Sequence, residues 1–287
     1  MTYKIMIDAS ADINPLFCER NDIAVIPMEY SLDDRVYIYE GCMDESSAKE
    51  FYRLLNENTQ IKTSQVNPFC YEEVFEPYVK SGISLLYLCL SSGLSSTINS
   101  ARTAAAVLKQ KYENAQIMII DTFAAAGGIG ILAERAARNR ESGMDISENC
   151  SDLISAISRL NHWFIVDDLI YLKKGGRIDA TTAFVGSALM IKPILKIDGS
   201  GKLQNVAKAH GTNAAVKKLL EIYKETSDDS SDDPVYICHS SAEKTADKLE
   251  ADVLSLSSST VIRKMLLSPI IGAHTGPGLV SLIYIGK

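Results

Sequence analysis

The 287-residue sequence lacks the marks of several common protein classes. It contains no uninterrupted apolar run of about 18 residues, so we expect no transmembrane helix. The 29 basic residues are outnumbered by 36 acidic ones, which gives a net charge of −7. Because no basic run stands out either, a nucleic-acid-binding protein is not expected. The first residues turn acidic too soon for the apolar region of a signal peptide, so none is expected.

Metal-binding patterns are missing too. The four histidines and six cysteines are scattered, without a C-x-x-C pair or the spacing of zinc ligands. Asp8, Asp12 and Asp121 follow apolar runs, but their spacing matches no metal motif. The sequence therefore predicts no metal site. We expect the cysteines to be reduced thiols of a cytoplasmic protein.

Two glycine-rich stretches resemble nucleotide-binding motifs but do not complete them. "DGSGK" at residues 198–202 fails the G-x-x-x-x-G-K-[ST] pattern and predicts a hairpin turn. "GIGILA" at residues 128–133 fits G-x-G-x-x-A, but it lies too far behind Asp121 for the tight turn of a dinucleotide site. No cofactor is therefore expected. The Ala- and Gly-rich residues 124–130 make this helix entry slim, which leaves room either for close helix packing or for a ligand.

Apolar periodicity predicts an α/β protein of two domains. In the first part, short apolar runs alternate with helical patterns, which is typical of a doubly wound, mainly parallel sheet. We expect its strands at residues 3–8, 23–30, 83–90 and 116–121, and its longest helices at 95–112 and 128–141.

The second part predicts an α+β domain with a mixed sheet. Its expected strands include a hairpin around residues 198–202 and a last strand near the C-terminus, and helices are expected at 213–225 and 242–254. We place the boundary near residues 158–161, which gives domains of residues 1–160 and 161–287.

Three segments are candidates for a binding site. "GAHTGPG" at residues 272–278 holds His274 in what we interpret as a sharply bent loop. "SSGLSSTINSA" at residues 91–101 follows a buried strand and opens a helix, so its hydroxyls either cap that helix or help bind an anion. "KKGGRID" at residues 173–179 places Arg177 on a Gly-Gly turn. This turn is either simply solvated or an exposed loop for a partner or a phosphate.

The order and wording of six segments resemble the bacterial DegV family. They are "IDASADI", "TSQVNP", "SSGLSSTINSA", "IDTFAAAGGIGIL", "LKKGGRI" and "IIGAHTGPG", and they span nearly the whole chain. The resemblance implies two α/β domains with a long-chain fatty acid in a tunnel between them. It also implies the role of lipid-binding subunit of a bacterial fatty acid kinase, which presents the acid to a separate ATP-binding kinase subunit.

The resemblance also assigns residues. Thr63, Ser95 and His274, with Ser64 and Thr275 beside them, match the positions that hold the fatty-acid carboxylate. Arg177 matches a position near the pocket mouth associated with the kinase partner. Tunnel lining is implied for Ser92, Gly93, Ala125, Ala126, Gly127 and Gly128. The chain departs from the family pattern, without loss of a carboxylate donor, at Ala9, Ser10, Val66, Asn67 and Ser96.

Two other functions compete with this one. A serine hydrolase acting on acyl esters would use Ser92 or Ser95 with His274, but it also needs an acid behind the histidine, and none lies nearby in the sequence. A structural or regulatory protein with an accidental cavity is the third possibility. We expect a carrier subunit that is not itself an enzyme, because a nucleophile elbow and a phosphate-binding loop are both missing.

Overall fold

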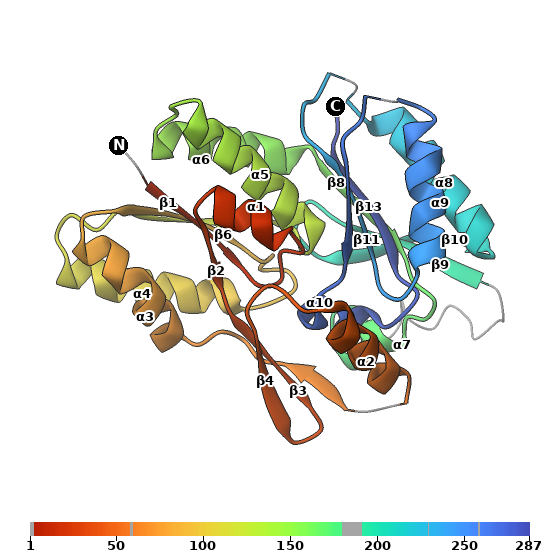
Figure 1. Cartoon of the computed structure of the whole chain (residues 1–287), viewed down its shortest axis with the longest axis horizontal. Coiled ribbons are helices and arrows are strands. Elements are labelled where there is room, and N and C mark those ends of the chain that lie inside the picture. The colour runs from red at the N-terminus through yellow and green to blue at the C-terminus, as the bar shows by residue number, and fades with distance from the viewer. Residues whose placement is uncertain (1–2, 58–59, 180–190, 229, 258) are drawn as a thin grey trace.

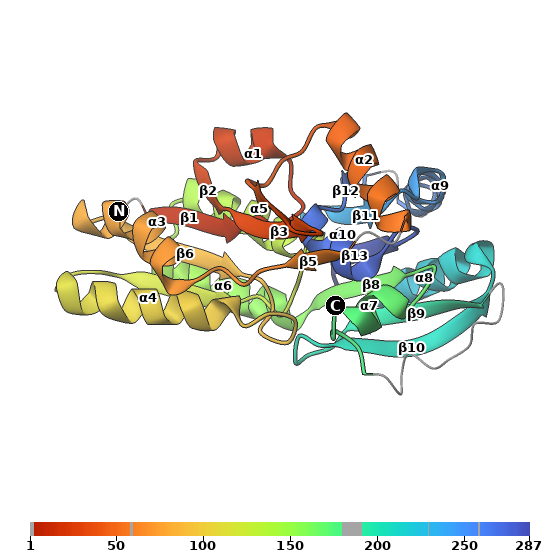
Figure 2. The same ribbon diagram turned by 90° about the horizontal axis from the view of Figure 1, so that it is seen from below.

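A computed structural model describes residues 3–57, 60–179, 191–228, 230–257 and 259–287. The chain forms two halves, each built on its own sheet, which lie side by side along the long axis (Figures 1 and 2). The first half contains a four-stranded parallel sheet in the order β2-β1-β6-β7. Its strands are β1 (Tyr3–Asp8), β2 (Ile23–Ile26), β6 (Ser84–Cys89) and β7 (Ile117–Asp121).

Helices cover both faces of this parallel sheet, as its nearly continuous apolar strands require. In Figure 1, α5 and α6 lie above the sheet, and α3 and α4 lie below it. The helices of this half are α1 (Pro15–Arg20), α3 (Pro68–Lys80), α4 (Thr97–Lys111), α5 (Gly127–Glu141) and α6 (Ile146–Ser158). The predicted doubly wound sheet is therefore confirmed.

The second half contains a mixed sheet in the order β10-β9-β8-β13-β11-β12, in which only β11 and β12 pair in parallel among the described strands. Its strands are β8 (Leu160–Ile165), β9 (Ile191–Ile197), β10 (Leu203–His210), β11 (Val235–His239), β12 (Ile262–Leu266) and β13 (Val280–Ile285). The predicted mixed sheet and the hairpin at residues 198–202 are confirmed.

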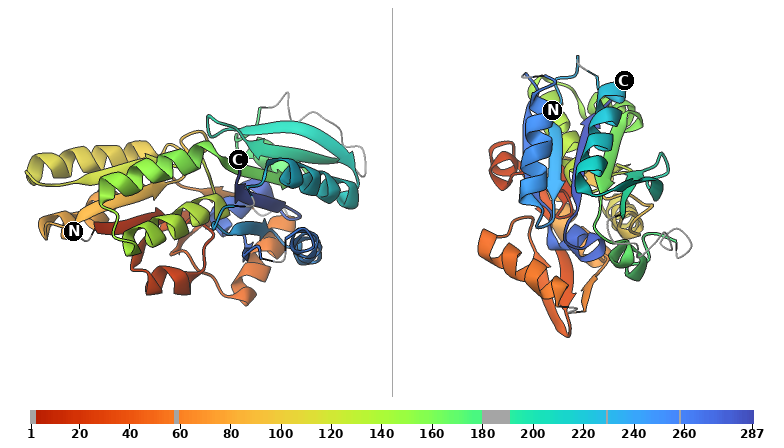
Figure 3. Two further views of the ribbon diagram at one scale, coloured as in Figure 1. Left: turned by 90° about the horizontal axis from the view of Figure 1, so that it is seen from above. Right: turned by 90° about the vertical axis from the view of Figure 1, so that its right-hand side faces the viewer.

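One face of the mixed sheet packs on α8 (Thr212–Thr226) and α9 (Glu243–Leu254), and Figure 3, right, views the molecule from this side. The other face is turned toward the first half, where β11 and β13 contact α5. Strand β8 begins at Leu160, next to the domain boundary that we predict.

A third, small sheet was not predicted. It has the order β4-β3-β5, with β3 (Met28–Leu32), β4 (Arg35–Tyr39) and β5 (Ile61–Thr63). In the chain, α2 (Glu45–Asn56) lies between β4 and β5. The single strand that we predicted over residues 23–30 is wrong. Pro27 interrupts it, so β2 joins the parallel sheet and β3 joins the small one. This sheet carries Thr63 toward the junction of the halves.

The interpretation of "GAHTGPG" as a sharply bent loop is wrong for His274. This residue is in the last turn of α10 (Pro269–Thr275), a short helix that starts with a proline and ends at Gly276, whose φ is 73°. Proline suits the first position of a helix, and a left-handed glycine suits the position after its end. Helix α10 packs against α7 (Ile170–Lys174), α2, β3 and β5, near the junction of the halves in Figure 2.

The slim segment at the start of α5 allows close helix packing and also borders a cavity. A Cβ at Gly127 would lie 2.5 Å from Cδ1 of Tyr236, and one at Gly130 would lie 2.9 Å from Cε1 of the same ring. These glycines therefore let α5 pack closely on β11. Ala125 and Ala126, just before the helix, instead line a cavity.

Candidate ligand-binding site

A cavity of about 430 Å³ lies between the two halves. Loops after β6 and β7 form one side, and the inward face of the mixed sheet, the small sheet and α10 form the rest. This volume falls in the usual range of small-molecule pockets. Most of the wall is apolar, through Met28, Leu90, Leu94, Phe164, Leu172, Ile197, Leu203, Leu267, Ile270, Ile271 and Leu279.

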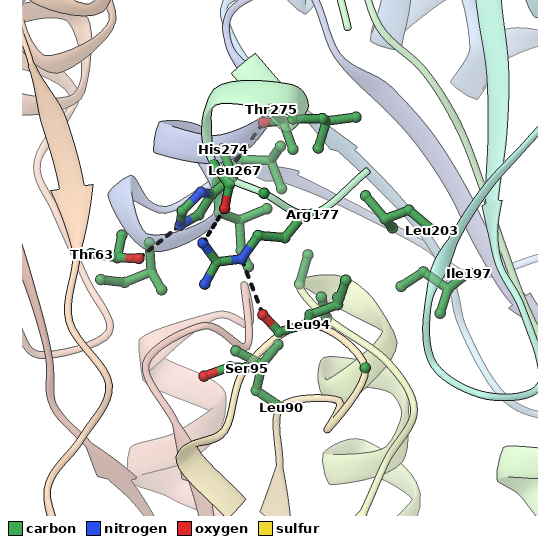
Figure 4. Close-up of a pocket in the computed structure, with 18 of the residues that line it drawn as sticks. Thr63, Leu90, Leu94, Ser95, Arg177, Ile197, Leu203, Leu267, His274 and Thr275 are labelled. Carbon is green, nitrogen blue, oxygen red and sulfur yellow. Dashed lines mark hydrogen bonds between the residues drawn. The ribbon is translucent and has the colours of Figure 1, made fainter. Parts of the chain in front are cut away.

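One end of this cavity, which we call the mouth end, is polar and consists of Thr63, Ser95, Arg177 and His274 (Figure 4). Thr63 Oγ1 and His274 Nε2 lie 2.7 Å apart and share a hydrogen bond. Burial, together with the nearby charge of Arg177, lowers the pKa of His274 to about 4. The imidazole is therefore neutral near pH 7. If its Nε2–H donates to Thr63, the threonine O–H is left free to donate to a ligand.

The backbone around His274 fixes the direction of its ring. A Cβ at Gly175 would lie 2.4 Å from Nδ1 of His274, so only glycine lets the turn after α7 pack on the imidazole. Beyond α10, a Cβ at Gly276 would lie 2.3 Å from Cδ2 of Tyr171. Close packing on two glycines thus holds the short helix against α7.

The Gly-Gly turn is exposed at Lys173, Lys174 and Gly176, but the side chain of Arg177 is not, which corrects our expectation for that side chain. The guanidinium is about half buried, and burial lowers its pKa. Its Nε donates to the carbonyl of Leu94 at 3.1 Å, and its Nη1 donates to the carbonyl of Gly175. In Figure 4 the guanidinium lies between His274 and Leu94. Arg177 therefore joins the turn after α7 to the loop that carries Ser95.

The loop between β6 and α4 contributes hydroxyls to the cavity and contacts the opposite half. Ser95 Oγ accepts a hydrogen bond from the N–H of Thr97 at 3.3 Å, so it satisfies an N–H at the helix start while also lining the cavity. Ser91 Oγ donates to the carbonyl of Gly201 at the hairpin tip at 2.8 Å. A Cβ at Gly93 would lie only 2.4 Å from that carbonyl oxygen. The hairpin tip thus closes the cavity over this loop.

The structure brings together nearly all residues that the sequence singled out. One cavity is lined by Thr63, Ser64, Ser92, Gly93, Ser95, Ala125, Ala126, Arg177, His274 and Thr275. Gly127 and Gly128 do not line it and pack instead on Tyr236 and His162. Sequence reasoning missed His162 and Ser281, which also line the cavity. Neither residue belongs to a sequence motif, and strand pairing alone places them beside the cavity.

A second cavity of about 540 Å³ lies on the other side of the mouth end. It shares Thr63, Arg177 and His274 with the first cavity. Its remaining walls add the cationic side chains of Lys62 and Lys174, both from exposed residues. We call this space the outer cavity. The outer cavity thus lines the approach to an anion at the mouth end with positive charge.

The geometry does not fit the serine hydrolase alternative. Nε2 of His274 bonds to Thr63 rather than to a serine. Nδ1 of His274 packs against Gly175, where a catalytic triad places a carboxylate. The charged group that affects the pKa of His274 is Arg177, a cation.

Within the described residues, no cluster of three or more His, Cys, Asp or Glu side chains is arranged to hold a metal ion. Over the same residues, no helix combines the length and the apolar character needed to cross a membrane.

Solved structures of similar fold support this description. A DegV lipid binding protein from Thermotoga maritima is 27% identical, with a TM-score of 0.83 over 100% of this chain and 99% of that one. A second Thermotoga maritima protein, described as revealing fatty acid binding function, is 28% identical, with a TM-score of 0.81 and 99% of each chain covered. The Streptococcus pneumoniae Fatty Acid Kinase B3 protein, loaded with linoleic acid, shares the fold at 19% identity, with a TM-score of 0.87 over 100% of both chains.

Sequence comparisons identify the family. DegV domain-containing proteins from Streptococcus pyogenes are 36% identical over 100% of this chain and 99% of their own length. One from Clostridium perfringens is 36% identical over 99% of this chain and 97% of its own. The family model for uncharacterised proteins of the DegV family matches residues 2–287. The chain therefore belongs to the DegV family.

Proposed function

We propose that this protein binds a long-chain fatty acid in the cavity between its halves and presents the carboxylate to a separate ATP-dependent kinase subunit. The observation that carries the binding step is one cavity whose walls are mostly apolar and whose mouth end is polar. The hydroxyls of Thr63 and Ser95 can donate there to a carboxylate, and the hydrogen bond with His274 holds the hydroxyl of Thr63 in place. The similarity to fatty-acid-binding structures at 27% and 28% identity supports the choice of ligand.

Burial of the acyl chain would provide most of the affinity. Each buried methylene contributes about 0.8 kcal/mol, so a chain of about sixteen carbons gives roughly 12 kcal/mol before ordering costs. On a protein with net charge −7, a carboxylate still needs directed donors. The mouth end thus sets which end of the ligand faces the outer cavity.

Extraction of the natively purified protein with organic solvent tests the binding step. Mass spectrometry of the extract should show close to one equivalent of long-chain fatty acid from the expression host. A clean extract, from protein that also fails to take up added fatty acid, would remove the basis of the proposal.

The outer cavity suggests how the kinase step is divided among residues. Lys174 lines only the outer cavity, whereas Arg177 lines both. Lys174→Glu should keep bound lipid and slow phosphorylation by the partner subunit, because reversed charge repels an acidic partner or a phosphate. Arg177→Glu should do the same. His274→Ala should instead weaken ligand binding by about 1–3 kcal/mol, since it leaves the hydroxyl of Thr63 without the hydrogen bond that holds it.

Lipid content and phosphorylation rate, measured on the same three variants, separate these roles. If folded Arg177→Glu is empty of lipid while Lys174→Glu is loaded, Arg177 belongs to the carboxylate site. The protein alone should not turn over ATP or activated esters. Ester hydrolysis that Ser95→Ala abolishes would restore the hydrolase alternative.

We also propose that the chain needs no cofactor and works in the cytoplasm. All six cysteines are free thiols, which fits a reducing compartment.

A further inference from the structure

A fully buried carboxylate, Asp8 at the end of β1, lies outside the lining of the cavity. Its Oδ1 accepts hydrogen bonds from the hydroxyl of Ser10 and, at 3.0 Å, from the N–H of the same residue. Its Oδ2 accepts from the N–H of Leu90 at 2.8 Å and from the hydroxyl of Tyr87 at 3.2 Å. Burial raises the pKa of Asp8, while all four hydrogen bonds lower it because they favour the ionised form. As a carboxylate, Asp8 can accept from all four donors.

A chain of buried hydroxyls leads from Asp8 to the start of α4. The hydroxyl of Tyr87 lies 2.8 Å from that of Tyr71, which in turn lies 3.0 Å from Oγ1 of Thr97. Burial raises the pKa of both tyrosines, so they keep their protons. Each hydroxyl has one proton to donate. Because Tyr87 donates to Asp8, it accepts from Tyr71. Tyr71 in turn accepts from Thr97, so the carboxylate sets the direction of every hydrogen bond in this chain.

The loop between β6 and α4 is thus held at both ends by Asp8. Leu90, where the loop starts, donates its N–H directly to the carboxylate. Thr97, the first residue of α4, is bound through the two tyrosines. The N–H of Thr97 also donates to Oγ of Ser95, which engages a lone pair of that oxygen and not its proton. The hydroxyl of Ser95 can therefore donate into the cavity that it lines.

Asp8 also supports a second part of the cavity wall. The carbonyl of Ser10 accepts a hydrogen bond from the N–H of Ala126 at 3.0 Å. Ala126 lines the cavity and has a φ of 52°, which is uncommon for a residue other than glycine. A change at Asp8 would therefore affect two wall segments, whereas a change at Tyr71 affects the loop that carries Ser95.

We propose that Asp8, Tyr87 and Tyr71 are positioning residues for the carboxylate site, which act through Thr97 to hold the hydroxyl of Ser95 toward the ligand. This rests on the proposed function, in which Ser95 donates to the fatty-acid carboxylate. None of the three lines the cavity, so they act on the ligand only through the loop. They should therefore affect recognition of the acid group and leave burial of the acyl chain unchanged.

The ratio of the affinities for palmitic acid and hexadecanol tests this proposal, because the two ligands share one chain and differ in the acid group. Both are measured by competition with a fluorescent fatty acid on the delipidated full-length protein. Tyr71→Phe should lower the preference for the acid roughly fivefold, which corresponds to about 1 kcal/mol, the size of one hydrogen bond. Tyr284→Phe is the matched control, since this buried tyrosine bonds to Thr226 at 2.6 Å in the second half. It should leave the ratio unchanged.

A double-mutant cycle shows whether the effect passes through Ser95. Ser95→Ala should itself lower the preference for the acid. Tyr71→Phe should then lower it no further in the Ser95→Ala background, because the hydroxyl that it positions is already missing. A residue that only stabilises the fold would instead weaken both ligands alike.

The proposal is overturned if Tyr71→Phe leaves the ratio of the two affinities at its wild-type value, or if its effect on the ratio adds to that of Ser95→Ala. Should Tyr71→Phe fail to fold, Thr97→Val decides, because it removes the other partner of the same hydrogen bond and must lower the ratio. If the wild type binds neither ligand, the proposed function itself fails. A wild type that binds palmitic acid, with an unchanged ratio in the variant, overturns only the positioning role.

Discussion

The two ends of the cavity each contain one buried histidine, but the two rings have different surroundings. Burial lowers the pKa of His274 to about 4 at the mouth end and that of His162, near Ile197 at the opposite end, to about 3. His274 shares a hydrogen bond with Thr63 and lies near the charge of Arg177. Nδ1 of His162 has no hydrogen-bond partner within the described chain. Burial is thus common to both rings, whereas only the ring at the mouth end has a side-chain partner beside the cavity.

The ends also differ in how they are built. His162 lies on a strand within the six-stranded sheet, where it pairs with Ile283 of β13 and its neighbour Trp163 pairs with Lys196 of β9. The mouth end combines a strand end, a loop and the last turn of a seven-residue helix. Its geometry therefore depends on close packing at a few glycines and on contacts at the ends of α10.

The largest expected effect comes from Gly276, which ends α10. Its φ of 73° and ψ of 179° are nearly restricted to glycine, and a Cβ there would lie 2.3 Å from the ring of Tyr171. Gly276→Ala should lower the free energy of unfolding by about 4 to 6 kcal/mol, because backbone strain and overpacking add. Urea denaturation measures this change.

Gly143→Ala is the matched control for Gly276→Ala. Gly143 also has a positive φ, of 93°, but a Cβ there would meet nothing within 4 Å. The loss should therefore be only about 1–2 kcal/mol, from strain alone. Equal losses in the two variants would show that packing on Tyr171 contributes nothing to the mouth end.

The next effect concerns Asp12, which connects the first half to the start of α10. Its Oδ1 accepts a hydrogen bond from the N–H of Ser268 at 2.8 Å. Burial, with a contribution from the charge of Asp8, raises the pKa of Asp12 from 3.8 to about 7. The folded protein thus binds this proton more tightly than the unfolded chain does. The resulting stability is fully present below about pH 4 and is lost as the pH rises through 7.

Asp12→Asn should remove this dependence. The difference in unfolding free energy between wild type and variant should change by up to about 4 kcal/mol between pH 4 and pH 7, since one pH unit corresponds to about 1.4 kcal/mol. His162→Leu should change the pH dependence of the unfolding free energy in the opposite direction. The lowered pKa of His162 contributes stability above its ordinary value of 6.5, and this is lost as the pH falls. A flat difference for Asp12→Asn would mean that Asp12 titrates normally.

Much of the fold could be predicted from local sequence. The apolar run of β6 is buried on both faces, as a central parallel strand requires, and the "DGSG" hairpin has strong turn chemistry. The small sheet could not be predicted in this way, because β3 pairs with β5 across a long insertion that contains α2. Helix α10 was missed because its glycine-rich end dominates the pattern, although Pro269 and Gly276 mark its two limits.

The candidate site was predictable to a different degree at its two ends. Thr63, Ser95 and His274 lie in motifs that resemble a known family, and the structure places them around one cavity. The position of His162 depends on the register of β8 against β9, which a single sequence does not contain. The exposure of Arg177 was misjudged because its composition is that of a solvated turn, while its actual partners are backbone carbonyls of distant segments.

The smallest expected effect is a change in titration that involves no loss of stability. A carboxylate bound at the mouth end places a negative charge near His274 and should raise the pKa of its imidazole from about 4 toward the ordinary value. Stearic acid brings no charge to the opposite end of the cavity, so the pKa of His162 should stay near 3. NMR titration of ¹⁵N-histidine-labelled protein, with and without stearic acid, measures both rings in one sample. His162→Leu assigns the signals. If only His162 responds, the carboxylate does not lie at the mouth end and the orientation of the ligand that we propose is reversed.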